Sequence, residues 1–127
     1  MKIHIMLALA SLASATLVSA SQSSAWAGPI GEWRTANGAA TIAIRPCGSS
    51  LCGFVASTRS RDDPTIGRQV FYDMKLHGDA WSGTIVDVVD GQRYSGNISL
   101  IGESTLRVEG CAMGGIFCGD QQWVRVR

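Results

Sequence analysis

Apolar and polar residues alternate with a period of two along most of the chain, and this pattern constrains the fold more than any other feature. In the stretch VFYDMKLH at residues 70–77, one face carries Val70, Tyr72, Met74 and Leu76, and the other face is mainly polar. Successive side chains of a β-strand point to opposite faces, so this pattern predicts a half-buried strand. No segment after residue 27 shows helical periodicity, which indicates an all-β fold.

Similar stretches recur at short, regular intervals. The turn-forming pairs Asn37-Gly38, Gly78-Asp79 and Asp90-Gly91 tolerate positive φ and favour tight hairpins between strands. About eight antiparallel strands are therefore expected, arranged as a single small up-and-down barrel or, alternatively, as a β-sandwich. The expected strands cover residues 31–35, 40–45, 51–58, 70–77, 81–89, 94–100, 105–109 and 123–127, with Ile98, Leu106, Val108, Val124 and Val126 facing inward.

One connection is longer than the others. Residues 59–69, RSRDDPTIGRQ, contain three arginines, two aspartates and a proline, and are expected to form an exposed loop. The adjacent Asp62 and Asp63 are expected to form surface ion pairs with Arg59, Arg61 or Arg68.

The first 27 residues have the features of a signal peptide. Lys2 is followed by an apolar run from Ile5 to Ala20, and Ala25 and Ala27 have the small side chains that a signal peptidase accepts. Cleavage after Ala27 would leave one β-barrel domain at residues 28–127, in the periplasm or secreted. The alternative is a membrane anchor, but the apolar run is shorter than the roughly 20 residues that a spanning helix needs. We therefore expect no membrane anchor in the mature chain.

The charge of the mature chain argues against a nucleic-acid partner. The chain has 11 basic and 10 acidic residues, and Lys2 is the only charged residue before Gly28. Residues 28–127 therefore carry no net charge when histidine is neutral, whereas binding of a phosphate backbone requires a clustered positive excess.

Four cysteines, Cys47, Cys52, Cys111 and Cys118, occur in the patterns C-x4-C and C-x6-C. These spacings disfavour a zinc site and a C-x2-C redox pair, and exported thiols oxidise, so two disulfides are expected. Three pairings are open. Loop-closure entropy favours a long-range pairing. The short intervening segments favour Cys47–Cys52 and Cys111–Cys118, because each can return the chain to bring its ends together.

The neighbouring glycines have a different expected role. Gly110, Gly114, Gly115 and Gly119 surround the second pair of cysteines and are expected to be turn glycines.

The two ends of the mature chain carry a possible closing contact. Gly31 and Trp33 lie on the first expected strand, and Trp123 and Arg125 lie on the last, with Arg127 as the alternative partner of Trp33. This arrangement resembles lipocalin-type barrels, in which an arginine of the last strand packs on a tryptophan of the first and closes one end. The alternative is that both tryptophans are ordinary core residues.

Several longer motifs appear in a characteristic order. They are GEW, PCGSSLCGF, MKLHGDAWSGTIVDVVDGQRYSGNISL and TLRVEGCAMGGIFCGDQQWVRV. Together they resemble the bacterial family known as domain of unknown function 2147. The resemblance covers nearly all of residues 31–126 and implies a small exported β-barrel of a proteobacterial envelope, with no established catalytic residues.

Little in the sequence indicates an enzyme. His77 is the only histidine after residue 27, and a hydrolase that uses it with Asp73 or Asp79 is the less favoured reading. No Gly-x-Ser-x-Gly motif occurs, and the acidic residues are too few in any one loop for a calcium site. We therefore predict no catalytic residue, no metal and no cofactor.

Binding is the function that the sequence favours. The barrel could hold a small apolar ligand or contact an envelope protein, with Tyr72, Met74, Trp81 and Tyr94 as candidate lining residues. An eight-stranded barrel is often just wide enough for its own side chains, so a filled core is the favoured alternative for these four residues. A structural or stress-related envelope protein is also compatible with the sequence.

Overall fold

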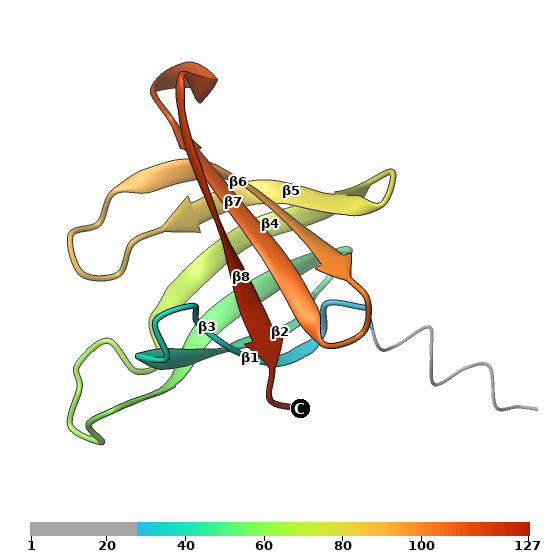
Figure 1. Ribbon diagram of the computed structural model, residues 1–127. Helices are drawn as coiled ribbons and strands as arrows, with labels where there is room; N and C mark the ends of the chain where they lie inside the picture. The colour runs from blue at the N-terminus through green and yellow to red at the C-terminus, as the bar shows by residue number, and fades with distance from the viewer. Residues whose placement is uncertain (1–27) are drawn as a thin grey trace, which may run out of the picture.

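The computed structural model describes residues 28–127, and the predicted signal peptide at residues 1–27 lies outside the described residues. Eight β-strands follow one another along the chain, with a short 3-10 helix before the last (Figure 1). They are β1 (Gly31–Arg34), β2 (Ala40–Cys47), β3 (Ser50–Thr58), β4 (Gln69–His77), β5 (Ala80–Val86), β6 (Arg93–Ile101), β7 (Thr105–Ala112), the helix η1 (Met113–Gly115) and β8 (Phe117–Arg125). Within residues 28–127, no helix is long and apolar enough to cross a membrane.

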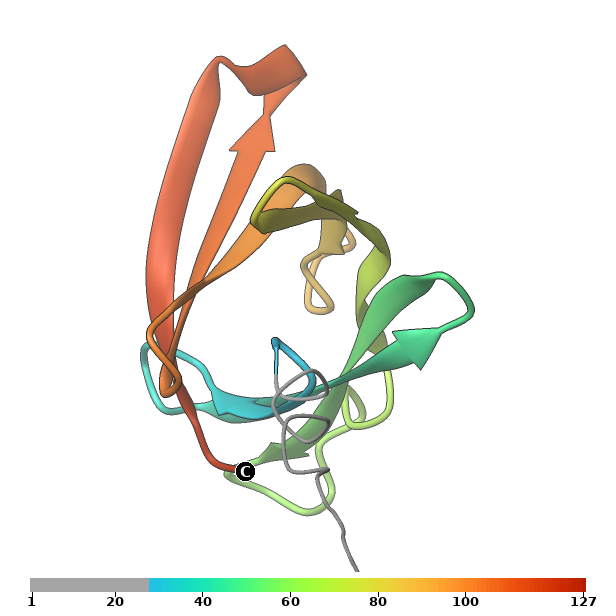
Figure 2. The same cartoon turned by 90° about the vertical axis from the view of Figure 1, so that its right-hand side faces the viewer.

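The strands form a closed antiparallel barrel in which each strand pairs with its neighbours in the sequence. The last strand pairs with the first, with Trp33 opposite Arg125 and Arg34 opposite Val124. Figure 2 shows the strands arranged in a ring, with the β7–β8 hairpin extending beyond it. The predicted up-and-down barrel is therefore confirmed, and the sandwich alternative is wrong. Closure pairs the strands that would otherwise form exposed sheet edges.

The up-and-down order gives the barrel two different ends. We call the end with the β1–β2, β3–β4, β5–β6 and β7–β8 connections the open end, and the end with the chain termini and the other three turns the closed end. The predicted exposed loop joins β3 to β4 at the open end. Gly78-Asp79 forms the two-residue turn between β4 and β5, whereas Asp90-Gly91 lies in a longer connection between β5 and β6.

The barrel interior contains a core of large apolar side chains. Phe71 and Trp123 stack within it, with ring centroids 5.5 Å apart and an interplanar angle of 16°. Ile98, Leu106 and Val108 face inward as predicted. The fully buried members of the core are Trp33, Phe71, Met74, Ile98 and Leu106, and the other buried members include Ile42, Ile44, Leu51, Val55, Val70 and Trp123.

The alternation predicted for β4 is wrong at Phe71 and at Leu76, whereas Val70 and Met74 are buried as predicted. Phe71 is fully buried, while Leu76, expected inside, is 55% exposed. The backbone of Asp73 has φ = 51°, and the register with β5 shifts between Tyr72 and Lys75. Such a β-bulge inserts an extra residue, so that Phe71 before it and Met74 after it both face the core. Leu76 is exposed because it lies near the end of β4, where the last three residues are all exposed.

Gly83 on β5 lets the bulge approach closely. A Cβ atom at Gly83 would lie 2.7 Å from the carbonyl oxygen of Asp73, which is closer than real Cβ contacts. A residue without a side chain is therefore needed opposite the bulge.

The inward positions predicted for the last strand are also wrong. Val124 is 55% exposed and Val126 is 40% exposed, while Trp123 is buried. Neighbouring residues of a strand face opposite sides, so Trp123 and Val124 cannot both point inward. Trp123 has the larger apolar surface, and its burial contributes more to stability.

Two of the four glycines expected in turns lie in strands. Gly114 and Gly115 have positive φ in the connection between β7 and β8, whereas Gly110 and Gly119 pair with each other inside these strands. The strands extend past the cysteines toward the hairpin tip, so these two positions belong to the barrel wall.

Candidate functional site at the open end of the barrel

A cavity of about 600 Å³ occupies the open end of the barrel. Its inner part is apolar, and its mouth carries hydroxyl, amide and charged side chains. The core fills the interior toward the closed end, so the expectation of a filled barrel holds for only part of it. The apolar lining consists of Ala39, Ala40, Ile42, Val55, Val70, Ile85, Val86, Val88, Val89 and Trp123, and the other lining residues are Thr35, Asn37, Thr58, Arg59, Ser60, Asp63, Thr65, Asp87, Tyr94 and Gln121.

A row of four glycines forms part of the barrel wall near this end. Gly83 on β5 pairs with Gly96 on β6, which pairs with Gly110 on β7, which pairs with Gly119 on β8. Each lies two residues from an inward-facing residue of its strand, so all four lie on the interior side. Side chains at these positions would project into the barrel, although none of the four glycines lines the cavity itself.

Each glycine of the row has different surroundings. A Cβ at Gly96 would collide with the side chain of Ile85, whereas a Cβ at Gly110 would lie 3.5 Å from the Cβ of Tyr94. At Gly119 no heavy atom lies within 4 Å of that position. Gly96 therefore accommodates Ile85, and Gly119 faces open space.

The four candidate lining residues from the sequence lie in different places. Tyr94 lines the cavity. Met74 is fully buried in the core, and Trp81 is partly buried and packs against it. Tyr72 is partly buried and does not line the cavity, and the guanidinium carbon of Arg93 lies 5.5 Å from the centre of its ring.

Several cavity residues were not singled out from the sequence. Ile85 could have been found, because it is four residues from Trp81 on the same strand and therefore lies on the same face. Gln121 carried no such signal, since polar residues on a strand are usually expected outside. The mouth residues come from loops whose positions depend on the closed barrel.

The β3–β4 loop at the cavity mouth is attached to the loops on both sides of it. Nη2 of Arg59 donates a hydrogen bond to the carbonyl oxygen of Asn37 at 3.1 Å. Nη1 of Arg68 donates to the carbonyl oxygen of Val88, also at 3.1 Å. Two arginines therefore hold the loop beside the cavity rather than forming ion pairs.

Asp63 stabilises this loop locally. Its Oδ1 accepts hydrogen bonds from the backbone N–H of Thr65 at 2.8 Å and from its hydroxyl at 2.6 Å. These hydrogen bonds, that of the side chain first, lower the pKa of Asp63 below its ordinary value of 3.8. Among residues 28–127, no salt bridge joins Asp62 or Asp63 to an arginine, so the ion pairs predicted for them are wrong.

The closed end is sealed by Arg125. Its guanidinium carbon lies 4.3 Å from the centre of the Trp33 ring. The same group donates to the carbonyl oxygens of Gly28 at 2.6 Å, Ile30 at 3.0 Å and Glu103 at 2.7 Å. The indole N–H of Trp33 donates to the carbonyl oxygen of Pro29 at 2.9 Å, so the polar groups around this plug are paired.

Gly31 makes room for this plug. Its φ is +142°, and a Cβ atom there would lie 2.8 Å from Nη1 of Arg125. A side chain at this position would collide first with the backbone carbonyl of Arg127 and also with this guanidinium. The closed end is therefore a structural seal, and the cavity is at the opposite end.

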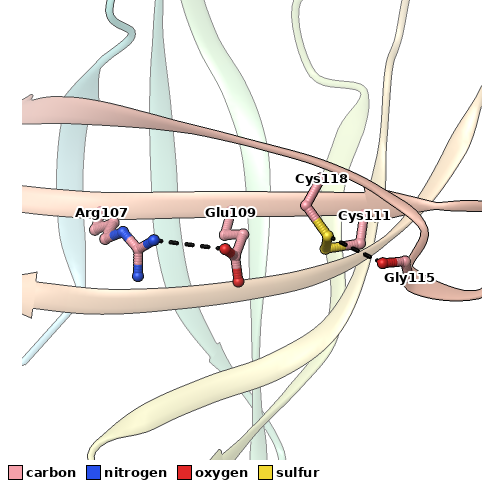
Figure 3. Close-up of a disulfide and its surroundings, with 5 residues drawn as sticks. All are labelled: Arg107, Glu109, Cys111, Gly115 and Cys118. Carbon is pink, nitrogen blue, oxygen red and sulfur yellow. Dashed lines mark hydrogen bonds and ion pairs between the residues drawn. A yellow bond between two sulfur atoms is a disulfide. The ribbon is translucent and has the colours of Figure 1, made fainter.

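Both pairs of cysteines are joined across hairpins. Cys47 and Cys52 flank the β2–β3 turn, with their Cα atoms 5.8 Å apart. Cys111 and Cys118 lie opposite each other on β7 and β8, with their Cα atoms 4.0 Å apart (Figure 3). The described residues contain no free cysteine and no group of metal-ligating side chains.

Figure 3 also shows the ion pair of Arg107 with Glu109 at 3.5 Å on the same hairpin, and the sulfur of Cys118 near the carbonyl oxygen of Gly115. Arg107 forms a second ion pair with Asp120 at 2.8 Å. These ion pairs are exposed and contribute little to stability.

The hydrolase reading has no support from the geometry around His77. His77 is exposed at the end of β4, beside the Gly78-Asp79 turn of the closed end. Within residues 28–127, no hydrogen bond or salt bridge joins it to Asp73 or Asp79, and it does not line the cavity.

Comparison with known proteins agrees with this description of the fold. A solved structure described as protein HP1028 from the human pathogen Helicobacter pylori, which belongs to the lipocalin family, is similar with a TM-score of 0.61. The match covers 77% of this chain and 82% of that chain at 12% sequence identity, so it shows a shared fold. A search of curated proteins found no match. The family model described as "uncharacterized protein conserved in bacteria (DUF2147)" matches residues 31–125, and the chain therefore belongs to this bacterial family.

Proposed function

We propose that this protein binds a small apolar ligand in the cavity at the open end of its barrel. The observation that carries the proposal is the cavity of about 600 Å³ with an apolar interior and a polar mouth. Pockets that hold small molecules typically measure roughly 300–1,000 Å³ and combine apolar walls with a few polar groups. Each 100 Å² of apolar ligand surface removed from water would contribute roughly 2.5 kcal/mol.

One residue of the cavity wall, Trp123, is packed against the core. Trp123 lines the cavity and stacks on Phe71, which is fully buried. A ligand that contacts Trp123 would therefore meet a surface held in place by the core. Preorganisation of this kind reduces the entropy lost on binding.

We place this function outside the cytoplasm, in the periplasm or the surrounding medium. The features that support export are the signal-peptide pattern of residues 1–27 and the two cysteine pairs at disulfide distance. Disulfides persist in oxidising compartments. A ligand would then be acquired after export, when the barrel has closed.

A cavity-blocking variant tests the proposal. Ala40 lines the cavity, and Ala56 is exposed on the adjacent strand β3, so Ala40→Trp and Ala56→Trp are a matched pair. We expect N-phenyl-1-naphthylamine to gain fluorescence with the wild type and with Ala56→Trp, and to lose most of that gain with Ala40→Trp. Equal fluorescence with both variants would contradict binding in the cavity.

Native mass spectrometry of the exported protein addresses the natural ligand. We expect an added mass of a few hundred daltons that disappears in Ala40→Trp, because a molecule of roughly that size fits the cavity. An added mass of protein size would instead favour a protein partner.

A protein partner is the second candidate, and one observation favours it. Met113 and Ile116 near the tip of the β7–β8 hairpin are 73% and 76% exposed, and the hairpin extends beyond the barrel (Figure 1). Exposed apolar side chains grouped at a tip are typical of contact surfaces.

A further inference from the structure

One polar side chain that lines the cavity has its orientation determined by the core. Oε1 of Gln121 accepts a hydrogen bond from the indole N–H of Trp123 at 2.9 Å. An indole nitrogen can only donate, so the amide oxygen of Gln121 must face it. The stacking of Trp123 on Phe71 holds the donor, and the donor in turn holds the amide.

The amide nitrogen of Gln121 is the part left for a ligand. Gln121 and Trp123 are two residues apart on β8, so they lie on the same face of the strand, and both line the cavity. Among the described residues, no hydrogen bond uses the Gln121 amide nitrogen as a donor. Because the oxygen is engaged by Trp123, the nitrogen with its two N–H groups is the end of the amide that remains available.

We propose that Gln121 selects ligands that carry a carbonyl or carboxylate oxygen on an apolar body. This inference rests on the proposed function and assigns the ligand class of the same site. An apolar ligand that covers Gln121 would remove its N–H groups from water without replacing their hydrogen bonds. A ligand with an acceptor oxygen restores one of them, so the site discriminates against a purely hydrocarbon ligand of the same shape.

Three variants separate this role from the others that Gln121 could have. Gln121→Glu keeps an oxygen for the indole N–H of Trp123 but replaces the amide nitrogen with a second acceptor. Gln121→Leu removes both polar groups. Gln122→Glu is the matched control, because it adds the same charge one residue later on the opposite face of β8, where Gln122 pairs with Arg107.

Two compounds of nearly equal shape provide the measurement. 2-Acetylnaphthalene carries a carbonyl oxygen, and 2-isopropylnaphthalene has a methyl group in its place. We expect the wild type and Gln122→Glu to bind the acetyl compound about tenfold more tightly in equilibrium dialysis, the effect of one hydrogen bond. Gln121→Leu and Gln121→Glu should both prefer the isopropyl compound, because the carbonyl oxygen then loses its hydrogen bonds to water without gaining a donor.

The outcomes distinguish the selectivity inferred for Gln121 from the proposed binding of ligands in the cavity. If the wild type binds both compounds equally and Ala40→Trp binds neither, the cavity binds ligands but Gln121 does not select them. If the wild type binds neither compound, both proposals fail. A loss of preference in Gln122→Glu would show that charge rather than position is responsible, and would overturn the role of Gln121. The wild-type comparison needs no variant, so misfolding of a variant cannot hide the result.

Discussion

The guanidinium of Arg125 lies 4.3 Å over the indole ring of Trp33, and this contact joins the last strand of the barrel to the first. The two residues are also direct partners in the short β1–β8 ladder. Because β1 has only four residues, few backbone hydrogen bonds can hold this seam, and the side-chain contact supplements them.

Arg125→Ala should destabilise the protein strongly. It removes the cation–π contact and the hydrogen bonds to three backbone carbonyls, so we expect a loss of about 2–4 kcal/mol in the free energy of unfolding. Arg125→Lys should recover only part of this loss, because an ammonium cannot reproduce the planar guanidinium. Urea denaturation measures both. Arg127→Ala is the control, with an expected loss below about 1 kcal/mol, since its ion pair with Glu32 is largely exposed.

The glycine row predicts different effects for substitutions at two of its positions, Gly96 and Gly119. Gly96→Ala should lower the free energy of unfolding by about 1–3 kcal/mol, because the added methyl group collides with Ile85. Gly119→Ala should change it by less than about 0.5 kcal/mol, because nothing lies within 4 Å of the new atom. Equal losses measured by thermal or urea unfolding would contradict the packing described here.

The cysteine pairs predict a simple peptide map. Non-reducing digestion should give one fragment joining Cys47 to Cys52 and one joining Cys111 to Cys118. Replacing both cysteines of one pair with serine should lower the free energy of unfolding by about 2 kcal/mol, because each bond closes only a short loop. A fragment that links one pair to the other would overturn this pairing.

The β3–β4 loop should respond to acid through Asp63. Its pKa in the folded protein is below the ordinary value of 3.8, so its hydrogen bonds stabilise the fold fully above about pH 3.8. That contribution is lost as the pH falls through the lower, folded pKa. Carboxyl titration by NMR should show this low pKa in the wild type and in Thr65→Ser, and a higher one in Thr65→Val. The same pKa in all three proteins would show that the Thr65 hydroxyl is not responsible.

Export should produce a chain that begins at Gly28. The prediction depends on Ala25 and Ala27, whose small side chains fit a signal peptidase. The intact mass of the exported protein should match residues 28–127 with two disulfides. A mass that includes Trp26 would contradict the cleavage site.

Much of the fold could be predicted from local patterns. Alternation along each strand, with glycine-containing turns between strands, was sufficient to predict about eight antiparallel strands, the exposed loop and the inward positions of Ile98, Leu106 and Val108. Closure as a barrel rather than a sandwich was the favoured alternative, on the basis of residues at the two ends of the chain. These features depend on nearest neighbours in the sequence or on residue type, so a single sequence contains them.

Other features depend on the pairing register between neighbouring strands. The bulge at Asp73, which lets Phe71 and Met74 both face the core, requires Gly83 on the adjacent strand. The site depends on register in the same way. Gly83, Gly96, Gly110 and Gly119 form a row only because four strands align, and Gln121 faces the cavity because Trp123 takes the interior side of β8.

One physical reason separates the features that could be predicted from the sequence from those that could not. A strand's own alternation determines which residues share a face, but a shift of one residue in its pairing moves every side chain to the other side of the sheet. Register is set by contacts between residues far apart in the chain. The sequence by itself therefore determined that this protein is a small β-barrel, and only the tertiary structure decided which side chains line its cavity.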